Sequence, residues 1–554
     1  MTAVDTQQSD RQKAGARPDG WNWSLPPARE VLLVLLVLLL VAAAALGPYI
    51  SHGGFFLDDW ADSAGTLYTP GGRTVGHVLS YFNNLFEYRP VLVVYTPLKY
   101  SILGTSIPLN LVWVTFMTVL VALLVFTILR TMGLPWAHAG LIAVLTLVYP
   151  WYDSLRFWVG TNPPLLGVFI AFVGIQVALI GVIRRSWRWH AAALVIYLLS
   201  VLAYELTAPV IVAAGFLYVM MMGFRSALSR WAADVVVVVT GLLWVGTHTD
   251  RPVSGFSNDL DHLWEIVKGG RDMIAWTFYP LGSSPRTGLV FVALGLVLIG
   301  GLIVYLYRRG NEVAPVVRWG LREWLLLGGA GLAVAALGWV MFIPADPYYT
   351  PSVFGATNRV NALSGYGLVI LAYAVVAFGV AALGGLWRPL RRYATLVTVL
   401  LMVLLGAAWV HVLERHARSW EAAYRAERTA LDRIEKQYPN LEPGTTLFAS
   451  NYPSWQALGV PIFAYSWDLN GAVQDEYESS EISASPVLPN TALQCRADGI
   501  GLSGEEAPET FGSYGSVKLL DLSTGLHAAP RNRHQCEKVA PKFVPGPEYV
   551  QYEY

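Results

Sequence analysis

Long apolar stretches alternate with short polar segments along the chain, from about residue 30 to residue 412. A helix needs about 20 apolar residues to cross a hydrocarbon core of about 30 Å. Eleven stretches approach or reach that length, so the sequence predicts a mainly α polytopic membrane protein with about eleven transmembrane helices. These run over residues 30–50, 108–130, 137–151, 163–183, 190–205, 207–223, 232–248, 287–307, 323–343, 365–386 and 394–412.

Two of these assignments have alternatives or weak points. The third stretch is short, and the sequence around Tyr204-Glu205 is equally compatible with a break inside a longer re-entrant pair. Composition supports the membrane assignment, since 55% of the 554 residues are hydrophobic and only 14% are charged, which excludes a single soluble domain. No cleavable signal peptide is predicted, because residues 2–20 are polar and no small-residue cleavage site follows, so the first helix is expected to remain as an anchor.

The formal net charge is zero, but Arg residues cluster between alternate apolar stretches. Cytoplasmic loops of membrane proteins carry an excess of Lys and Arg, so these clusters mark one side of the membrane. They predict a cytoplasmic N-terminus, and an odd number of spans puts the C-terminus outside; the membrane expected is a bacterial plasma (inner) membrane. The clusters are Arg130, Arg184–Arg188, Arg225 with Arg230, Arg308–Arg322, and Arg388–Arg392.

The same pattern divides the chain into four parts. Residues 1–28 are polar and predict a disordered cytoplasmic tail. Residues 29–412 form the predicted transmembrane domain, with a large first outer loop at 51–107. Residues 413–437 intersperse Glu with Arg and predict a connecting helix. Residues 438–554 predict a small extracytoplasmic domain, mixed or mostly β.

Cys495 and Cys536 are the two cysteines of the chain, and both lie in this last domain. We expect them to form a disulfide, because an oxidising exterior permits one. The bond closes a loop of about 40 residues, which the chain-entropy relation converts to about 4 kcal/mol of stabilisation. No spacing of Cys and His predicts a zinc site.

The first outer loop carries the residues that most suggest chemistry. Asp58 and Asp59 follow three apolar residues just past the first span, and Tyr88, Arg89 and Lys99 come before the second. Either carboxylate is a candidate general base, because two adjacent carboxylates disfavour joint ionisation and one pKa rises. The pair is also a candidate ligand for a divalent cation, Mg²⁺ or Mn²⁺. The alternative is an acidic helix cap at the membrane surface.

Three cations are candidate phosphate ligands. Arg89 and Lys99 stand where the chain re-enters the membrane, and Arg359 occupies the last outer loop before the tenth span. An Arg holds a phosphate with a bidentate pair of hydrogen bonds. Arg89 and Lys99 are equally typical of anchors that snorkel to phospholipid headgroups.

Three further residues lie beside apolar runs. Glu205 stands between two of them, and ionisable residues so near hydrocarbon usually face a cavity or a partner. Asp153 and Arg156 belong to a short outer loop rich in Trp and Tyr. They are equally compatible with a site and with a mutual pair inside an interfacial aromatic belt.

An acidic pair in a large first outer loop, followed by Tyr-Arg-Pro at 88–90 and by Gly104 before the second span, resembles the GT-C fold of polyprenyl-phosphate-sugar glycosyltransferases. The pattern is most similar to that of the protein O-mannosyltransferases and the transmembrane-and-tetratricopeptide mannosyltransferases. Asp153 matches the acidic residue of that family's loop after the third span, and Glu205 matches the Glu at the end of its fifth. Thr161 stands where the family has Arg, so Arg156 is the substitute for that phosphate contact. The similarity covers about residues 30–220.

The resemblance implies a membrane enzyme, a glycosyltransferase that transfers a sugar with inversion from a polyprenyl-phosphate donor. The implied acceptor is a cell-envelope glycan or protein on the outer face, which the C-terminal domain would bind; mannose, arabinofuranose and glucose all fit as the sugar. No nucleic acid is expected among the partners, and the lipid bilayer is one. The implied roles are Asp58 as base with Asp59 as its partner, and Arg89, Lys99, Arg156 and Arg359 as donor phosphate ligands, with Tyr88, Asp153 and Glu205 as further site residues.

Two other functions are compatible with the sequence. A lipid-linked sugar flippase or transporter would be expected to carry charged or broken helices near the bilayer midplane. The predicted spans are nearly free of charge, which disfavours that function. A non-catalytic scaffold of envelope assembly would keep the same fold without turnover.

Overall fold

The computed structural model of the chain describes residues 23–68, 74–249, 256–282, 320–345, 348–504 and 510–550. The predicted span at 287–307 and residues 1–22 of the predicted tail lie outside these ranges. The α-helices that the structure describes before the C-terminal domain are α2 (Ala28–His52), α3 (Asp58–Leu67), α4 (Val75–Phe86), α5 (Pro90–Leu103), α6 (Ile107–Thr131), α7 (Trp136–Val148), α8 (Ser154–Phe157), α9 (Asn162–Ile183), α10 (Trp187–Ala203), α11 (Ala208–Met222), α12 (Phe224–Thr247), α13 (Phe256–Phe278), α15 (Leu321–Val340), α16 (Ser364–Leu386) and α17 (Arg388–Gln437).

Within the described residues, eight helical segments are long and apolar enough to cross a membrane. Their positions agree with predicted spans, and the chain is a mainly helical, multi-pass membrane protein. The predicted spans at 137–151 and 190–205 correspond to the shorter helices α7 and α10. With a rise of about 1.5 Å per residue, the 13 residues of α7 extend about 20 Å, which is less than the thickness of a hydrocarbon core. The count of eleven therefore exceeds the number of long apolar helices that the structure describes.

Prolines begin several of these helices. The first turns of α5, α6, α9 and α11 contain Pro90, Pro108, Pro163 and Pro209, respectively. A proline there removes an N–H that would have no partner within the helix, and its fixed φ suits the first turn. The chain therefore starts a new helix at each of these points without losing a backbone hydrogen bond.

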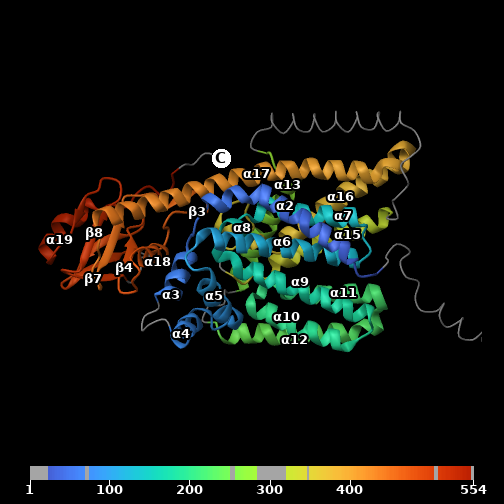
Figure 1. The fold of residues 1–554 in the computed structure, drawn as a ribbon, viewed down its shortest axis with the longest axis horizontal. Helices are drawn as coiled ribbons and strands as arrows, with labels where there is room; N and C mark the ends of the chain where they lie inside the picture. Colours follow the sequence, from blue (N-terminus) through green and yellow to red (C-terminus); the bar gives the residue numbers. More distant parts are fainter. Residues whose placement is uncertain are drawn as a thin grey trace, which may run out of the picture.

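The first outer loop, predicted at 51–107, is itself mostly helical. It contains α3, α4 and α5, of which α3 lies beside α18 (Ser466–Glu476) of the C-terminal domain in Figure 1. α3 begins at Asp58, and Gly54, just before it, approaches α17 so closely that an added Cβ would lie 2.0 Å from the Tyr424 ring. This contact ties the start of the loop to the long helix.

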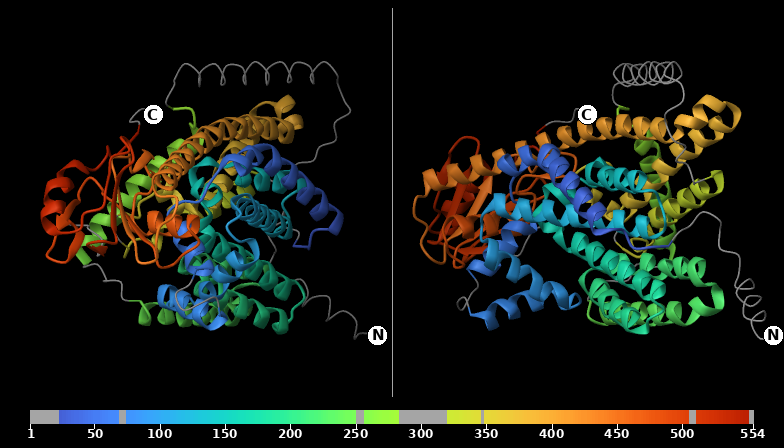
Figure 2. Two further views of the ribbon diagram at one scale, coloured as in Figure 1. Left: turned by 60° about the vertical axis from the view of Figure 1, so that its left-hand side comes forward. Right: turned by 45° about the vertical axis from the view of Figure 1, so that its right-hand side comes forward.

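α17 is one continuous helix of 50 residues. It joins the predicted last span at 394–412 to the predicted connecting helix at 413–437 without a break, and at about 1.5 Å per residue it is about 75 Å long. Figures 1 and 2 show it running along the bundle to the C-terminal domain at one end of the molecule. The helical bundle and the C-terminal domain are therefore linked by a single continuous helix.

The C-terminal domain is mixed α/β. Its main sheet has the order β4-β1-β8-β9, and β1 pairs in parallel with both β4 and β8. Helix α18 (Ser466–Glu476) lies between β1 and β4 in the chain, as expected for a crossover between parallel strands. The sulfur atoms of Cys495 on β5 and Cys536 on α19 are bonded. The strands and the last helix are β1 (Thr446–Ser450), β2 (Trp455–Ala457), β3 (Val460–Pro461), β4 (Ser483–Pro486), β5 (Ala492–Cys495), β6 (Gly499–Ser503), β7 (Phe511–Ser513), β8 (Val517–Asp521), β9 (His527–Ala528) and α19 (Arg533–Val539).

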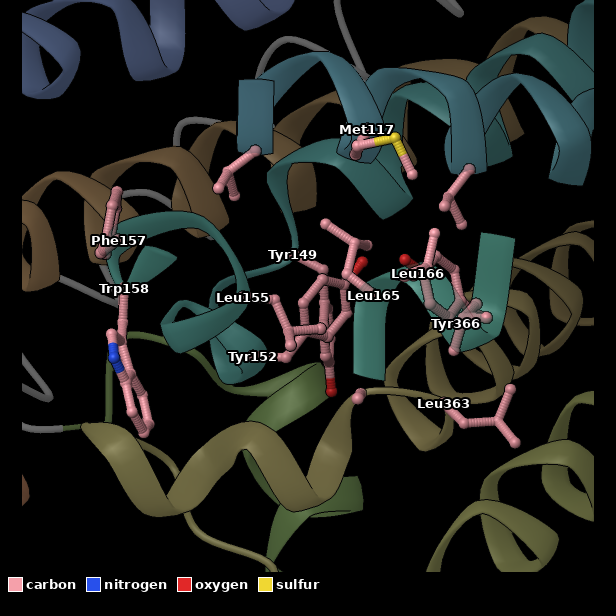
Figure 3. Close-up of a cluster of buried hydrophobic side chains, with 14 of the residues drawn as sticks. Met117, Tyr149, Tyr152, Leu155, Phe157, Trp158, Leu165, Leu166, Leu363 and Tyr366 are labelled. Atoms are coloured by element: carbon pink, nitrogen blue, oxygen red, sulfur yellow. The ribbon is translucent and has the colours of Figure 1, made fainter. Parts of the chain in front are cut away.

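Aromatic residues of the short outer segment after α7 are buried rather than interfacial. Trp151 is 4% exposed, and Tyr149, Tyr152 and Trp158 are 1% exposed or less. Figure 3 shows Tyr149, Tyr152 and Leu155 gathered with residues of neighbouring helices in one hydrophobic cluster. These residues therefore lie in the protein core and do not form an aromatic belt at the membrane surface.

Candidate functional site

A cavity of about 510 Å³ lies between the first outer loop and the ends of the bundle helices, with Trp467 of the C-terminal domain at its wall. Its walls come from α3, α4 and α5, from the start of α9, from the break between α10 and α11, from the segment between α15 and α16, and from α18. Its volume suits a small ligand or the head of a larger one. The polar and aromatic residues that line it include Asp58, Asp62, Tyr88, Arg89, Tyr204, Glu205, Tyr349, Arg359 and Trp467.

The two predicted acidic residues point in different directions. Successive side chains on a helix are about 100° apart, so Asp58 and Asp59 cannot share one face of α3. Asp58 is half-buried and lines the cavity, where its Oδ1 accepts a hydrogen bond of 3.1 Å from Trp467 Nε1. Asp59 is fully buried; its Oδ2 accepts from the Phe56 backbone N–H at 3.0 Å and its Oδ1 from the Tyr100 hydroxyl at 3.4 Å. Of the two, Asp58 is therefore the carboxylate that a ligand can reach.

Burial raises the pKa of Asp58 above its usual 3.8, while the charge of Arg359 and the indole N–H of Trp467 lower it. Burial also raises the pKa of Asp59, and the nearby Lys99 opposes that rise. A base is most effective when its pKa lies near the operating pH, so a raised value at Asp58 favours proton transfer from a hydroxyl.

Lys99 is buried beside these carboxylates and does not line the cavity. Its Nζ lies 3.9 Å from the centroid of the Tyr100 ring. Its charge lowers the pKa of both Asp59 and Asp62, whose own burial raises them. The lysine therefore compensates the negative charge of α3 from behind the cavity wall.

Arg89 and Glu205 form a bidentate ion pair across the cavity wall. Arg89 Nε lies 2.9 Å from Glu205 Oε2, and Nη2 lies 2.5 Å from Oε1. The guanidinium also stacks on Tyr204 at 3.9 Å and on Tyr88 at 4.9 Å from the ring centroids. Glu205 stands in the break between α10 and α11, so the pair joins the first outer loop to the transmembrane bundle.

Arg359 lies in the short helical segment Ala356–Asn361 and is half-buried. Its Nη2 donates to the Tyr349 hydroxyl at 3.2 Å, and its guanidinium lies 5.1 Å from the Trp158 ring centroid. Its buried Nε has no hydrogen-bond partner among the described residues. The guanidinium therefore keeps donor capacity for a ligand in the cavity.

Asp153 and Arg156 do not line the cavity and do not pair with each other. Asp153 Oδ2 accepts a hydrogen bond of 3.0 Å from Trp420 Nε1 on α17. Arg156 is 1% exposed and donates to the backbone carbonyls of Tyr149 at 2.6 Å and Thr146 at 2.8 Å. Both charges hold the buried outer segment in place beneath the site.

Trp467 and Tyr349 are among the cavity residues that were not sequence candidates. Trp467 comes from α18, and Tyr349 precedes the segment that carries Arg359. Tyr348-Tyr349 in a predicted outer loop was a weak signal for a site. Trp467 had none, because 409 residues separate it from Asp58 in the sequence.

The donor set does not favour a divalent cation held by the Asp58-Asp59 pair. Asp59 already accepts hydrogen bonds from Phe56 and Tyr100, on the side away from the cavity. In the described ranges, no group of three or more His, Cys, Asp or Glu residues has a geometry that could hold a metal ion.

A buried acid on α18 predicts a pH-dependent stability. Burial raises the pKa of Asp475 to about 7, while the Ser63 hydroxyl on α3 lowers it and Glu476 raises it. A carboxyl whose pKa rises on folding stabilises the folded state fully below its unfolded value, and this contribution is lost as the pH rises through the folded value. The melting temperature should therefore fall between about pH 4 and about pH 7, and Asp475→Asn should make that fall smaller. The exposed Asp498→Asn is the matched control, and identical pH slopes in Asp475→Asn and the wild type would contradict the assignment.

No protein-family model matches the chain, and no curated protein sequence does. Among solved structures, the chain is similar to the oligosaccharyltransferase of Archaeoglobus fulgidus tethered with an acceptor peptide, with 12% identity, a TM-score of 0.35 and coverage of 82% of this chain and 63% of that one. The apo form of the same enzyme gives 13% identity, a TM-score of 0.35 and coverage of 76% and 62%. The chain thus spans about three fifths of the length of these proteins.

Proposed function

We propose that this protein is an inverting membrane glycosyltransferase that moves a sugar from a polyprenyl-phosphate donor to a cell-envelope acceptor on the outer face of a bacterial plasma membrane. The observation that carries the proposal is the shared cavity: Asp58, Arg89 and Arg359 all line it. A carboxylate that can take a proton and cations that can hold a phosphate are the two requirements of this reaction.

In the proposed step, the acceptor hydroxyl oxygen bonds to the anomeric carbon of the donor while the bond from that carbon to the phosphate oxygen breaks. Asp58 takes the hydroxyl proton. The polyprenyl phosphate leaves with the bonding electron pair and needs no protonation, because its added negative charge is stabilised by a cation. Attack from the face opposite the phosphate inverts the anomeric centre.

Arg359 is the proposed principal phosphate ligand. Its Nε has no partner among the described residues, whereas Arg89 is already engaged by both oxygens of Glu205. Arg89 then contributes positive charge and holds the wall of the site. Lys99 and Arg156, which lie outside the cavity lining, have structural roles in this proposal.

The test is transfer by the purified protein in lipid nanodiscs. Radiolabelled polyprenyl-phosphate mannose, glucose and arabinofuranose are supplied as donors with an extract of envelope glycans and proteins as acceptor. We expect one donor to be consumed and its sugar to be recovered in the acceptor with inverted configuration by NMR. Absence of transfer from all three donors, or a retained configuration, would contradict the proposal. Mass spectrometry of envelope glycans from a deletion strain identifies the missing sugar independently.

A further inference from the structure

One face of α18 lies against α3 along most of the length of both helices. Trp467, Gly471 and Asp475 recur every four residues and therefore share that face. A Cβ added at Gly471 would lie 2.4 Å from the carbonyl carbon of Trp60, so the two backbones are in direct contact there. Figure 1 shows α18 and α3 side by side. This close approach fixes the C-terminal domain on the first outer loop.

The same face carries an aromatic ring into the cavity. Trp467 lines the cavity, yet 45% of its surface is exposed. Its ring stacks on Tyr465 with the centroids 4.4 Å apart and the planes 10° apart, and Trp455 supports Tyr465 edge-on at 6.2 Å. One face of the indole is therefore stacked on Tyr465, while the ring keeps an exposed surface at the cavity.

We propose that Trp467, backed by Tyr465, is an acceptor subsite that binds a sugar ring of a glycan and directs its hydroxyl to Asp58. The inference rests on the proposed transferase function and names its acceptor class. An aromatic face carries partial negative charge, so the polarised C–H groups on one side of a sugar ring pack favourably against it. The indole N–H at the same time bonds to Asp58, which puts the base beside the platform.

The polar groups around Trp467 suit a ligand with many hydroxyl groups better than they suit a peptide. Asp58 and Asp62 both line the cavity and can accept hydrogen bonds from sugar hydroxyls. An extended peptide is usually bound by pairing its backbone with the edge of a sheet. The cavity residues that the structure describes come from helices and loops, with no strand edge among them.

Trp467 therefore has two separable tasks. Its ring binds the acceptor, and its Nε1–H orients Asp58 and lowers the pKa of that carboxyl. Trp467→Phe keeps an aromatic face and loses the N–H, whereas Trp467→Ala loses both. The two variants consequently distinguish binding from positioning.

The experiment uses the full chain in nanodiscs and two readouts. Binding of mannotriose, an arabinofuranose trisaccharide, maltotriose and a Ser/Thr-rich peptide is followed by saturation-transfer NMR, and transfer from the polyprenyl-phosphate donor gives KM and kcat. Trp467→Ala should raise the KM for the accepted glycan about 10-fold, as expected for a stacking contact of about 1.5 kcal/mol, with donor binding unchanged. Trp467→Phe should keep that KM while lowering kcat and shifting the acid limb of its pH profile to higher pH.

Phe511→Ala, which removes an exposed ring from β7 of the same domain, is the matched control and should change neither readout. An unchanged KM in a folded Trp467→Ala protein, or transfer to the peptide in preference to every glycan, overturns the inference and leaves the transferase function intact. Glycan binding that depends on Trp467 without transfer from any donor overturns the transferase function and leaves the sugar-binding platform.

Discussion

Asp58→Asn is expected to lower the rate of sugar transfer by about 10²- to 10⁴-fold, the usual cost of a lost general base. Asn keeps the size of the side chain and an oxygen that can accept from Trp467 Nε1, so folding and donor binding should be retained. The measurement is single-turnover transfer from a synthetic polyprenyl-phosphate sugar, with donor affinity determined separately. In the wild type, kcat/KM should rise with pH through a pKa above 3.8, since only the ionised carboxylate accepts the proton.

The matched control is Asp59→Asn, the same chemical change one residue along α3. Asp59 accepts hydrogen bonds from Phe56 and Tyr100 and is fully buried, so its substitution should lower the melting temperature. Transfer per folded molecule should remain well above that of Asp58→Asn. Equal losses in the two variants would assign the base function to the pair, and near wild-type transfer in both would leave Asp58 and Asp59 as a helix cap.

Arg359→Ala should weaken donor binding and slow transfer together. A charge-assisted hydrogen bond to phosphate is worth about 1.5 to 3 kcal/mol, which corresponds to about 10- to 150-fold in donor affinity. Because the charge of Arg359 lowers the pKa of Asp58, its removal should also shift the acid limb of the pH profile to higher pH. Arg359→Lys should restore the pH profile more than the affinity, since Lys supplies the charge without the bidentate fork.

Arg89 differs from Arg359 because its guanidinium is already paired with Glu205. Arg89→Ala leaves Glu205 without its bidentate partner, and breaking a largely buried pair costs up to about 3 to 5 kcal/mol of stability. The double variant Arg89→Met with Glu205→Gln removes both charges and should recover most of the folding. If that folded double variant loses donor affinity as severely as Arg359→Ala, Arg89 and not Arg359 is the principal phosphate ligand.

The sequence predicted the apolar helices well because hydrophobic patterning and helix length depend on local composition. Asp58, Arg89, Glu205 and Arg359 were all singled out for their charge beside apolar runs, and they line one cavity. The sequence could not separate Asp58 from Asp59, because that distinction depends on the helical phase of α3 against its neighbours.

Other features depended on contacts that no local pattern reveals. Arg156 was a reasonable phosphate ligand by charge, yet its guanidinium donates to the carbonyls of Tyr149 and Thr146 within a buried segment. Trp467 joins the cavity only because α18 packs on α3, and the sequence carries no sign of that pairing. The predicted mostly-β alternative for the last domain missed α18 for the same reason, since a short helix between parallel strands has little periodicity of its own.

Because α17 is one unbroken helix, its length fixes the distance between the membrane and the proposed acceptor subsite at Trp467. A helix adds about 1.5 Å and about 100° for every residue, so a single insertion between its membrane part and the C-terminal domain would both lift that domain and rotate it away from α3. An insertion of seven residues would restore the rotation to within about 20° while leaving the domain about 10 Å too high. In the proposed function, the length of α17 therefore sets the distance between the bilayer and the Trp467 ring that binds the acceptor.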